Sequence, residues 1–356
     1  MRRQSIQRAL ALIFGGAILV AACGGGASPA PSQEPTSASS TEPSVGPTEI
    51  PGTKEFTVGF TSPGLSSAPF LAAIEALRGQ GYAIDTPIIE SSELLSQAVA
   101  SGQFAFGSGA NNAVLSANQA GANLKVVISR VNNEWTLYVR TATITSCADL
   151  GGKSLAIHSD GAVSTAMVRN YIEENCPGTA PNYVVIPGSP NRVAALLADQ
   201  IDASPLELSD SLTIDAEASD TFSLLTSLAA DLPNLQTTSI YVNGDFAAEN
   251  PGSVLALVKA VLTEYRRIAG DAAARKADAE TYTGDSIDPE RIDAAAAKYT
   301  ELEMFDSNGG VTADNLNYTA GFFGPDGTGT VDKVYSLDEW TDLSFLEAAL
   351  SELGTQ

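Results

Sequence analysis

Residues 154–204 read SLAIHSDGAVSTAMVRNYIEENCPGTAPNYVVIPGSPNRVAALLADQIDAS. Short apolar runs at 154–158, 182–186 and 201–204 alternate with longer helical stretches at 163–174 and 191–199. This alternation predicts strand, helix, strand, helix and strand, which is the pattern of a sheet with helices packed on its faces. The stretch therefore indicates an α/β fold.

The same alternation occurs in the preceding part of the chain. Strands are expected at 56–60, 82–89, 104–107, 124–130 and 135–140, and helices at 69–79, 93–101 and 112–120. After a strand at 238–242 the chain is mostly helical, with helices expected at 251–268, 289–299 and 312–323. We therefore expect two α/β lobes and a helical C-terminal section. Because a strand returns at 238–242, the chain should cross between the lobes twice, with the first lobe at 54–141 plus 238–356 and the second at 142–237.

The N-terminus has the features of an export leader. Arg2, Arg3 and Arg8 accompany an unbroken stretch of 14 apolar or glycine residues at 9–22, which is too short to span a bilayer. This stretch ends in Leu-Val-Ala-Ala before Cys23, which resembles a bacterial lipobox. The resemblance implies cleavage after residue 22 and a lipid on Cys23 as the only membrane anchor. The alternative is simple secretion with Cys23 inside the discarded peptide.

Residues 23–53 read as a tether. Of the 29 residues at 24–52, 20 are Gly, Ser, Thr or Pro and none is Lys or Arg. Such a composition cannot bury enough apolar surface to offset the entropy of ordering, so a disordered stalk is expected. The folded part then begins near Lys54 and contains about 300 residues, enough for one large or two medium domains.

The chain is strongly acidic. It has 19 Lys and Arg against 42 Asp and Glu, a formal charge of -23. Without the three leader arginines the charge is 16 minus 42, or -26. Such a polyanion repels nucleic acid and anionic lipid heads, so neither is an expected partner. The overall charge does not set the sign of a small ligand, because a pocket can carry a local field opposite to the global one.

Two cysteines remain besides Cys23. Cys147 lies before the strand that opens the second lobe, and Cys176 lies at the end of the helix that follows. A helix packed antiparallel to its preceding strand returns its C-terminus to the start of that strand, so the two thiols should lie within disulfide reach. In an exported protein such a pair favours one disulfide over free or metal-binding thiols.

Six segments follow one another in a familiar order. They are AVASGQFAFGSG at 98–109, GANLKVV at 121–127, DLGGKSLAI at 149–157, AALLADQIDA at 194–203, NPGSV at 250–254 and WTDLSFL at 340–346. Together they resemble ABC-transporter substrate-binding proteins of the branch for nitrate, sulfonates, taurine and pyrimidine precursors. The resemblance implies a two-lobed, type II periplasmic-binding-protein fold. It also implies closure over a small molecule that is presented to a membrane permease.

The chain departs from that family in two places. The glycine of the familiar L-x-x-G-x-x-D-A pattern is replaced by Asp199 or Gln200, at a surface turn. The pyrimidine synthases that share this fold use a histidine and a cysteine cluster, whereas His158 is the single histidine here. Their chemistry is therefore not expected, and no catalytic residue is assigned.

Ligands of open α/β lobes bind outside the carboxyl ends of strands, near helix N-termini. Four loops qualify, with the third favoured: 61–70 with Ser66 and Ser67; 107–112 with Ser108, Asn111 and Asn112; 158–165 with His158, Gly161, Ser164 and Thr165; and 204–207 with Glu207. Each has a structural alternative. The serines and asparagines can cap helices or form tight turns, His158 can be a satisfied strand-end residue, and Glu207 can be an ordinary solvated side chain.

Arg130 and Trp135 decide the ligand class. Arg130 can clamp a sulfonate or carboxylate through its planar fork, or form a surface ion pair. Trp135 can stack on a planar ligand, or be buried in the core or hinge. The ligand therefore stays open among a sulfonate or related small anion, a pyrimidine or other planar heterocycle, and a carboxylate.

No metal or other cofactor is expected. The sequence has no closely spaced His or Cys pair and no G-x-x-x-x-G-K-[ST] motif, and DSNGG at 306–310 lacks the spacing of a calcium loop. We expect a monomeric, lipid-anchored solute receptor of an ABC importer. The alternatives are a sensor lipoprotein without a permease and, third, an enzyme on the same scaffold.

Overall fold

The computed structural model describes residues 50–61, 64–283 and 291–356. The leader, Cys23 and nearly all of the expected stalk lie outside these residues. Within the described part, no helix combines the length and the apolar character needed to cross a membrane.

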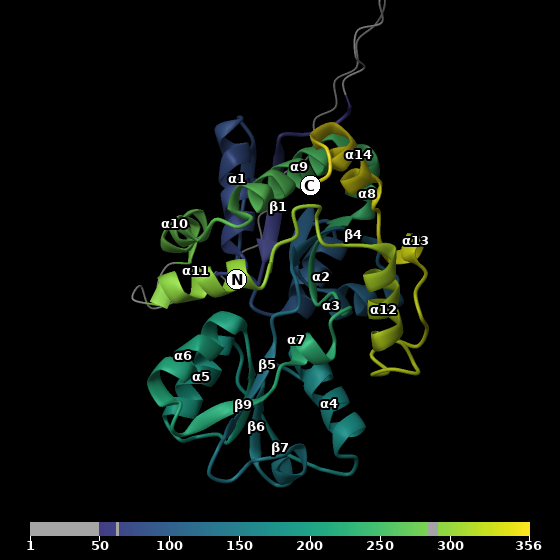
Figure 1. Cartoon of the computed structure of the whole chain (residues 1–356). Helices are drawn as coiled ribbons and strands as arrows, with labels where there is room; N and C mark the ends of the chain where they lie inside the picture. The colour runs from purple at the N-terminus through teal and green to yellow at the C-terminus, as the bar shows by residue number, and fades with distance from the viewer. Residues whose placement is uncertain (1–49, 62–63, 284–290) are drawn as a thin grey trace, which may run out of the picture. The chain divides into compact units, whose positions relative to one another are not determined.

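Two five-stranded mixed sheets organise the described chain (Figure 1). The first has the strand order β2-β1-β3-β10-β4. Its strands are β1 (Glu55–Phe60), β2 (Ala83–Asp85), β3 (Phe106–Ala110), β4 (Leu124–Val131) and β10 (Thr238–Asn243). β1 is parallel to β2 and β3, and β10 runs antiparallel between β3 and β4. β4 and β10 are buried along nearly all of their length, as the sequences LKVVISRV and TSIYVN favour for central strands covered on both faces.

The second sheet repeats this arrangement with the order β7-β6-β8-β5-β9. Its strands are β5 (Thr136–Arg140), β6 (Ser154–Ile157), β7 (Asn182–Val185), β8 (Ala203–Leu206) and β9 (Phe222–Thr226). β6 is parallel to β7 and β8, and β5 runs antiparallel between β8 and β9. β5 is therefore a strand of the second sheet, although its residues fall within the predicted first lobe. Only four residues separate β4 from β5, and so short a connection usually joins neighbours in one sheet.

The chain crosses between the sheets at 132–135 and again at 227–237, which confirms the two predicted crossings. The two crossing segments are hydrogen-bonded to each other. Asn133 Nδ2 donates to the carbonyl oxygens of Leu228 and Leu232 at 3.2 and 3.3 Å. The Ala229 N–H donates to the Trp135 carbonyl at 3.0 Å. The crossings therefore form one bonded pair.

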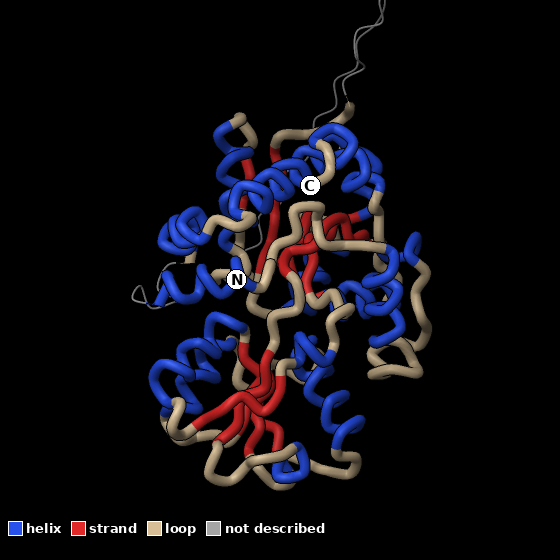
Figure 2. Tube along the Cα trace, in the orientation of Figure 1, coloured by secondary structure: helices blue, strands red, loops and turns tan. Residues whose placement is uncertain are grey.

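Helices cover both sheets (Figure 2). Those packed with the first sheet are α1 (Ala68–Gly79), α2 (Ser92–Ala100), α3 (Asn111–Gln119), α8 (Gly244–Glu249), α9 (Pro251–Ile268), α10 (Ala272–Tyr282), α11 (Ile292–Glu301), α12 (Ala313–Phe323), α13 (Leu337–Trp340) and α14 (Ser344–Leu353). Those of the second sheet are the 3-10 helix η1 (Cys147–Leu150), α4 (Val163–Asn175), α5 (Ser189–Leu197), α6 (Leu208–Ala218) and α7 (Leu228–Asp231). In Figure 1, α4, α5 and α6 surround β5, β6, β7 and β9.

Local sequence explains where several helices begin. Proline lies in the first turn of α1 and α9, where its missing N–H costs nothing. The side chains of Ser91, Asn243 and Thr312 accept N–H bonds from the first turns of α2, α8 and α12. We did not expect α6, α10 or β9, because the sequences LSDSLTIDAEA and AAARKADAETY show no clear apolar stripe and the strand FSLLT is short.

Cys147 and Cys176 form a disulfide, with their Cα atoms 5.9 Å apart. Cys147 begins η1, just before β6, and Cys176 is the C-cap of α4. The bond therefore joins the two ends of the strand–helix unit, as the return of the helix along its strand predicts.

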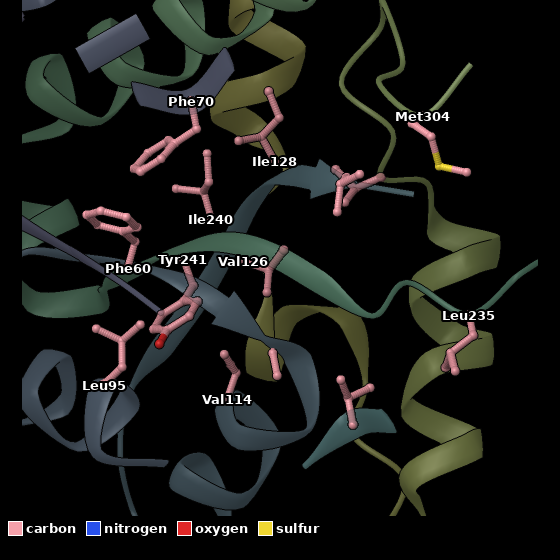
Figure 3. Packing of buried hydrophobic residues seen from close by; sticks show 14 of the residues in the cluster. Phe60, Phe70, Leu95, Val114, Val126, Ile128, Leu235, Ile240, Tyr241 and Met304 are labelled. Atoms are coloured by element: carbon pink, nitrogen blue, oxygen red, sulfur yellow. The ribbon is translucent and has the colours of Figure 1, made fainter. Parts of the chain in front are cut away.

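Gly107 makes room for the Tyr241 ring, because a Cβ at Gly107 would lie 2.4 Å from Cζ of Tyr241. At Gly109 the nearest atom to an added Cβ is Leu95 Cδ2, at 3.3 Å. Tyr241 is fully buried in β10 and belongs to the core drawn in Figure 3. The glycine at position 107 is therefore explained by an internal contact.

Asp199 occupies the turn where the family pattern has a glycine. Its φ is 57°, in the left-handed region, which Asp tolerates better than most residues. Arg140 Nη1 contacts Asp199 Oδ1 at 2.9 Å. The departure from the pattern is therefore accommodated at an exposed turn.

Gly107→Ala should lower the free energy of unfolding by about 1–3 kcal/mol, because the added methyl overlaps the buried Tyr241 ring. Gly321→Ala in α12 is the control: nothing lies within 4 Å of its Cβ position, so stability should be unchanged or slightly higher. Urea unfolding of both variants tests this, and an equally small effect at both positions would contradict the packing account.

Replacing Cys147 and Cys176 with serine should lower the free energy of unfolding by about 3–4 kcal/mol. The bond closes a loop with a sequence separation of 29, and its loss restores chain entropy to the unfolded state. Denaturant unfolding with and without reductant measures the effect. Reductant should not change the stability of the double variant.

Candidate functional site

A cavity of about 140 Å³ lies where loops of the two lobes meet. Its first-lobe walls come from the segment after β1, the start of α2 and the end of β4, and its second-lobe walls from the segments after β6, β7 and β8. Its polar lining comprises Thr61, Glu90, Ser92, Glu93, Arg130, Trp135, His158, Ser164, Ser189, Asn191, Arg192, Glu207 and Thr238. The cavity therefore lies at the carboxyl ends of parallel strands, where ligands of open α/β folds bind.

A larger hollow of about 1070 Å³ lies at the opposite, amino ends of β1 and β2. Among the described residues, no member of its lining has a buried side-chain nitrogen or oxygen without a hydrogen-bond partner. The cavity between the lobes has three such atoms: Arg130 Nε, Ser164 Oγ and Arg192 Nη2. Buried polar groups are normally hydrogen-bonded, so these three atoms mark the smaller cavity as the candidate ligand site.

Arg192 is fully buried in the first turn of α5. Its Nε donates to the Pro205 carbonyl at 3.1 Å and its Nη1 to the Ile186 carbonyl at 3.3 Å. These carbonyls, near the ends of β7 and β8, fix the guanidinium and leave Nη2 without a protein partner. Burial lowers the pKa of Arg192 to about 10, so it remains a cation at neutral pH.

Arg130 reaches the cavity from the end of β4, and only 5% of its surface is exposed. Its Nη1 lies 3.4 Å from Thr61 Oγ1, and its Nε has no partner. Neither Arg130 nor Arg192 belongs to any ion pair among the described residues. The site thus holds two buried cations, one from each lobe, that no carboxylate contacts directly.

His158 links the two lobes as a neutral imidazole. Its Nδ1 accepts the Gly188 N–H at 3.0 Å, and its ring bonds to the backbone of Glu90 in the other lobe. Burial, and then the charge of Arg192, lower its pKa. His158 therefore lines the cavity and also has the satisfied strand-end role that we considered as its alternative.

Glu134 lies in the first crossing segment and is only 3% exposed. Burial, followed by the nearby Glu207 carboxylate, raises its pKa to about 8, although hydrogen bonds from Tyr299 and Ser66 and the charge of Arg130 oppose this. Burial dominates because removing a carboxylate from water favours its neutral form. Glu134 is thus protonated in most molecules at neutral pH.

Asp210 is a second buried carboxyl group near the arginines. It lies in the first turn of α6 and is 8% exposed. Burial, and then the Glu207 carboxylate, raise its pKa to about 7, against a hydrogen bond from Ser189 and the charge of Arg192. Glu207, the half-buried N-cap of α6, thus influences both buried carboxyl groups.

Five of the predicted site residues line the cavity: Arg130, Trp135, His158, Ser164 and Glu207. Two more connect the lobes beside it, because Asn112 Nδ2 donates to the Gly161 carbonyl at 2.5 Å. A Cβ at Gly161 would lie 2.6 Å from Glu93 Oε1, so the Glu93 side chain of the first lobe also lies close to Gly161. Ser66 bonds to Glu134.

The other predicted residues do not line the cavity. Ser67 exchanges hydrogen bonds with Gly64, Asn111 Nδ2 donates to the Gln236 carbonyl, and Thr165 Oγ1 donates to the Ser159 carbonyl. Ser108 is buried within β3.

We did not predict three residues of the site from the sequence: Arg192, Glu134 and Asp210. The loop PGSP at 187–190 follows a predicted strand and precedes a predicted helix, so the same rule that selected four other loops would have found it. Arg192 is in the first turn after that loop. Glu134 gives no such signal, since its burial depends on packing by α11, which is distant in sequence.

Two α/β lobes joined by two crossing segments, with a polar cavity at the facing strand ends, define the periplasmic-binding-protein class of folds. The NMT1/THI5 like family model matches residues 80–272, more than half of the chain. The chain therefore belongs to this family.

Similar solved structures support the fold assignment. They include the alkanesulfonate-binding protein SsuA from Xanthomonas axonopodis pv. citri bound to MOPS, with a TM-score of 0.63, 16% identity and coverage of 81% of this chain and 97% of that chain. They also include the periplasmic nitrate-binding protein NrtA from Synechocystis PCC 6803, with a TM-score of 0.61, 11% identity and coverage of 86% and 90%. A zinc-bound ligand-binding component of an ABC-type import system from Staphylococcus aureus has a TM-score of 0.68, 12% identity and coverage of 83% and 99%. No curated protein sequence matches the chain.

Glu134→Gln should make stability less sensitive to pH. A carboxyl whose folded pKa is raised stabilises the protein fully below its unfolded pKa of about 4.3, and this contribution is lost as pH rises toward about 8. The amide cannot ionise. Across this window, the free energy of unfolding of the variant should therefore rise relative to that of the wild type by at most about 1.4 kcal/mol per pH unit. Urea unfolding at pH 5, 6, 7 and 8 measures the difference.

The exposed Glu173 in α4 provides the matched control, and Glu173→Gln should follow the wild-type pH profile. Parallel profiles for Glu134→Gln and wild type would show that Glu134 ionises equally well in the folded and unfolded chains.

Proposed function

We propose that the protein is the extracytoplasmic solute-binding component of an ABC importer, tethered through a lipid on Cys23. In this proposal it captures a small oxyanion of the sulfonate or nitrate type between its lobes and delivers it to a membrane permease. The supporting observation is the set of three buried donors without partners, Arg130 Nε, Ser164 Oγ and Arg192 Nη2, in one cavity between the lobes. The solved binding proteins for alkanesulfonate and nitrate share the fold.

The donor set suits an oxyanion because guanidinium groups bind the oxygens of planar or tetrahedral oxyanions through charge-assisted hydrogen bonds. Arg130 comes from the first lobe, and Arg192 and Ser164 come from the second. An anion bonded to both arginines therefore makes contacts that exist only when the lobes are together. A ligand with more contacts in the closed state shifts the population toward closure.

The cavity favours an anion over a stacked heterocycle. The guanidinium carbon of Arg192 lies 6.0 Å from the centroid of the Trp135 ring, so a cation already lies over that ring. The volume of about 140 Å³ also suits a compact ligand. A planar heterocycle would need the Arg192 side chain, which two backbone carbonyls hold, to move.

A binding role without catalysis accounts for His158. Its Nδ1 accepts the Gly188 N–H and its ring also bonds to the Glu90 backbone, so neither bond leads to a nucleophile. We therefore place the sensor lipoprotein, which needs the same site, ahead of an enzyme as the alternative.

The purified protein should be stabilised by nitrate, methanesulfonate or taurine in a thermal-shift assay, since a ligand that binds only the folded state raises the melting temperature by mass action. Ser164→Ala should weaken binding roughly ten-fold through loss of one hydrogen bond to a charged group. Its folding should be unaffected, because Ser164 Oγ has no protein partner.

Ser116→Ala is the control for this substitution, because Ser116 is exposed in α3 and outside the cavity. It should bind as the wild type does. Stabilisation by pyrimidine precursors or riboflavin and by none of the anions would overturn the oxyanion assignment, and no stabilisation by any of them would argue against the proposed site.

A further inference from the structure

The cavity arginines share their surroundings with three carboxyl groups, Glu134, Asp210 and Glu207. If all three were ionised, this group of five side chains would carry two positive and three negative charges. An incoming anion would then meet a net negative charge. With Glu134 and Asp210 neutral, the same group carries a net charge of +1. Neither residue is part of the cavity lining, whose own carboxyl groups are those of Glu90, Glu93 and Glu207. Protonation of the two buried carboxyls therefore makes the surroundings of the arginines less repulsive to an anion.

Glu134 is enclosed by groups from four elements. The Tyr299 hydroxyl of α11 donates a hydrogen bond to Glu134 Oε2, and Ser66, before α1, donates a second hydrogen bond to Glu134. Arg130 of β4 attracts its negative charge, and Glu207, after β8, repels it. Glu134 forms no ion pair among the described residues, so no cation in direct contact compensates its negative charge.

Asp210 has similar surroundings in the second lobe. Glu207 repels its charge from the N-cap of the same helix, Arg192 of α5 attracts it, and Ser189 at the start of α5 donates a hydrogen bond. Asp210 too has no ion pair in the described part of the chain. It is buried, so water does not stabilise its charged form.

The other titratable groups of the cavity do not distinguish the two protonation states. Burial, and then the charge of Arg192, lower the pKa of His158, and its Nδ1 accepts a hydrogen bond as a neutral imidazole does. Glu90 is exposed, and Glu93 bonds to Ser91 and Ser159. Solvent screens the charge of the exposed Glu90 more than that of a buried group. Glu93 is half-buried and lines the cavity with Glu207, so Glu134 and Asp210 act on an anion together with these carboxyl groups.

We infer that anion capture in this cavity is accompanied by proton uptake at Glu134 and Asp210. This inference rests on the proposed function. The reaction is the binding of one anion and of up to two solvent protons, with no covalent change. The anion adds negative charge near both carboxyls, so it favours their neutral forms, and by linkage their protonation favours the anion.

The direction of the pH effect follows from this linkage. The unliganded pKa values are about 8 for Glu134 and about 7 for Asp210, and a bound anion raises both. Affinity should be constant below about pH 6, where both groups are already protonated. It should then fall as pH rises through 7 to 9, by at most ten-fold per pH unit for each proton taken up.

The test uses nitrate and methanesulfonate, which stay singly charged from pH 5.5 to 9, with the full purified protein. Their dissociation constants are measured across this range in amine buffers, because phosphate and sulfonate buffers are themselves competing anions. Proton uptake is measured with a pH electrode when neutral sodium salts are added to lightly buffered protein at pH 8. We expect at least ten-fold weaker binding at pH 9 than at pH 6, and measurable proton uptake.

Glu134→Gln mimics the protonated side chain at every pH. It should bind more tightly than wild type at pH 9, about equally at pH 6, and with less proton uptake at pH 8. Asp210→Asn should act in the same direction at a lower pH, and it tests the inference independently if Glu134→Gln fails to fold. Glu173→Gln, on the exposed face of α4, should retain the wild-type profile.

The outcomes separate the two proposals. Anion binding that is independent of pH, without proton uptake, or that strengthens as pH rises, overturns the inference and leaves the proposed function standing. If neither anion nor any other member of the ligand panel binds at any pH, the proposed function fails and the inference fails with it.

Discussion

The insertion of β10 between β3 and β4 is the constraint on which the rest of the structure depends. It is antiparallel to both neighbours and is buried along its whole length, so the first sheet is incomplete until the chain has returned from the second. β5 fills the matching position in the second sheet. Each sheet is thus completed by the strand that follows a crossing, β5 in the second sheet and β10 in the first. The two crossing segments are hydrogen-bonded to each other.

This arrangement brings buried donors to one place without partners of their own. The loops after the parallel strands of both sheets meet at the crossings, and Arg130, Ser164 and Arg192 each retain an unpartnered polar atom there. An unsatisfied buried polar group costs about 1–3 kcal/mol. A fold that retains three of them in one cavity gives up stability that an oxygen-rich ligand can restore, which is the physical basis of the ligand site proposed above.

The sequence predicted the architecture well where the signal was local. The helix at 251–268 was predicted with its observed bounds because Pro251 marks its first turn and its apolar residues form a continuous stripe. β5 was assigned to the wrong lobe because strand propensity does not say which sheet a strand joins. The role of Gly107 is not visible in the sequence, because only the register of β3 with β10 places Tyr241 opposite this residue. Likewise, the burial of Glu134 depends on the distant Tyr299.

An anion site in a chain with a formal charge of -23 is consistent with electrostatics. Most of the acidic side chains are solvated, and their fields are screened over about 8–10 Å, whereas Arg130 and Arg192 are buried. The surface charge therefore contributes less to the local field than the buried groups do. Among those groups, the carboxyls of Glu134 and Asp210 are the ones whose charge can change near neutral pH. The local field at the cavity thus depends on the protonation of these two carboxyls as well as on the net charge of the chain.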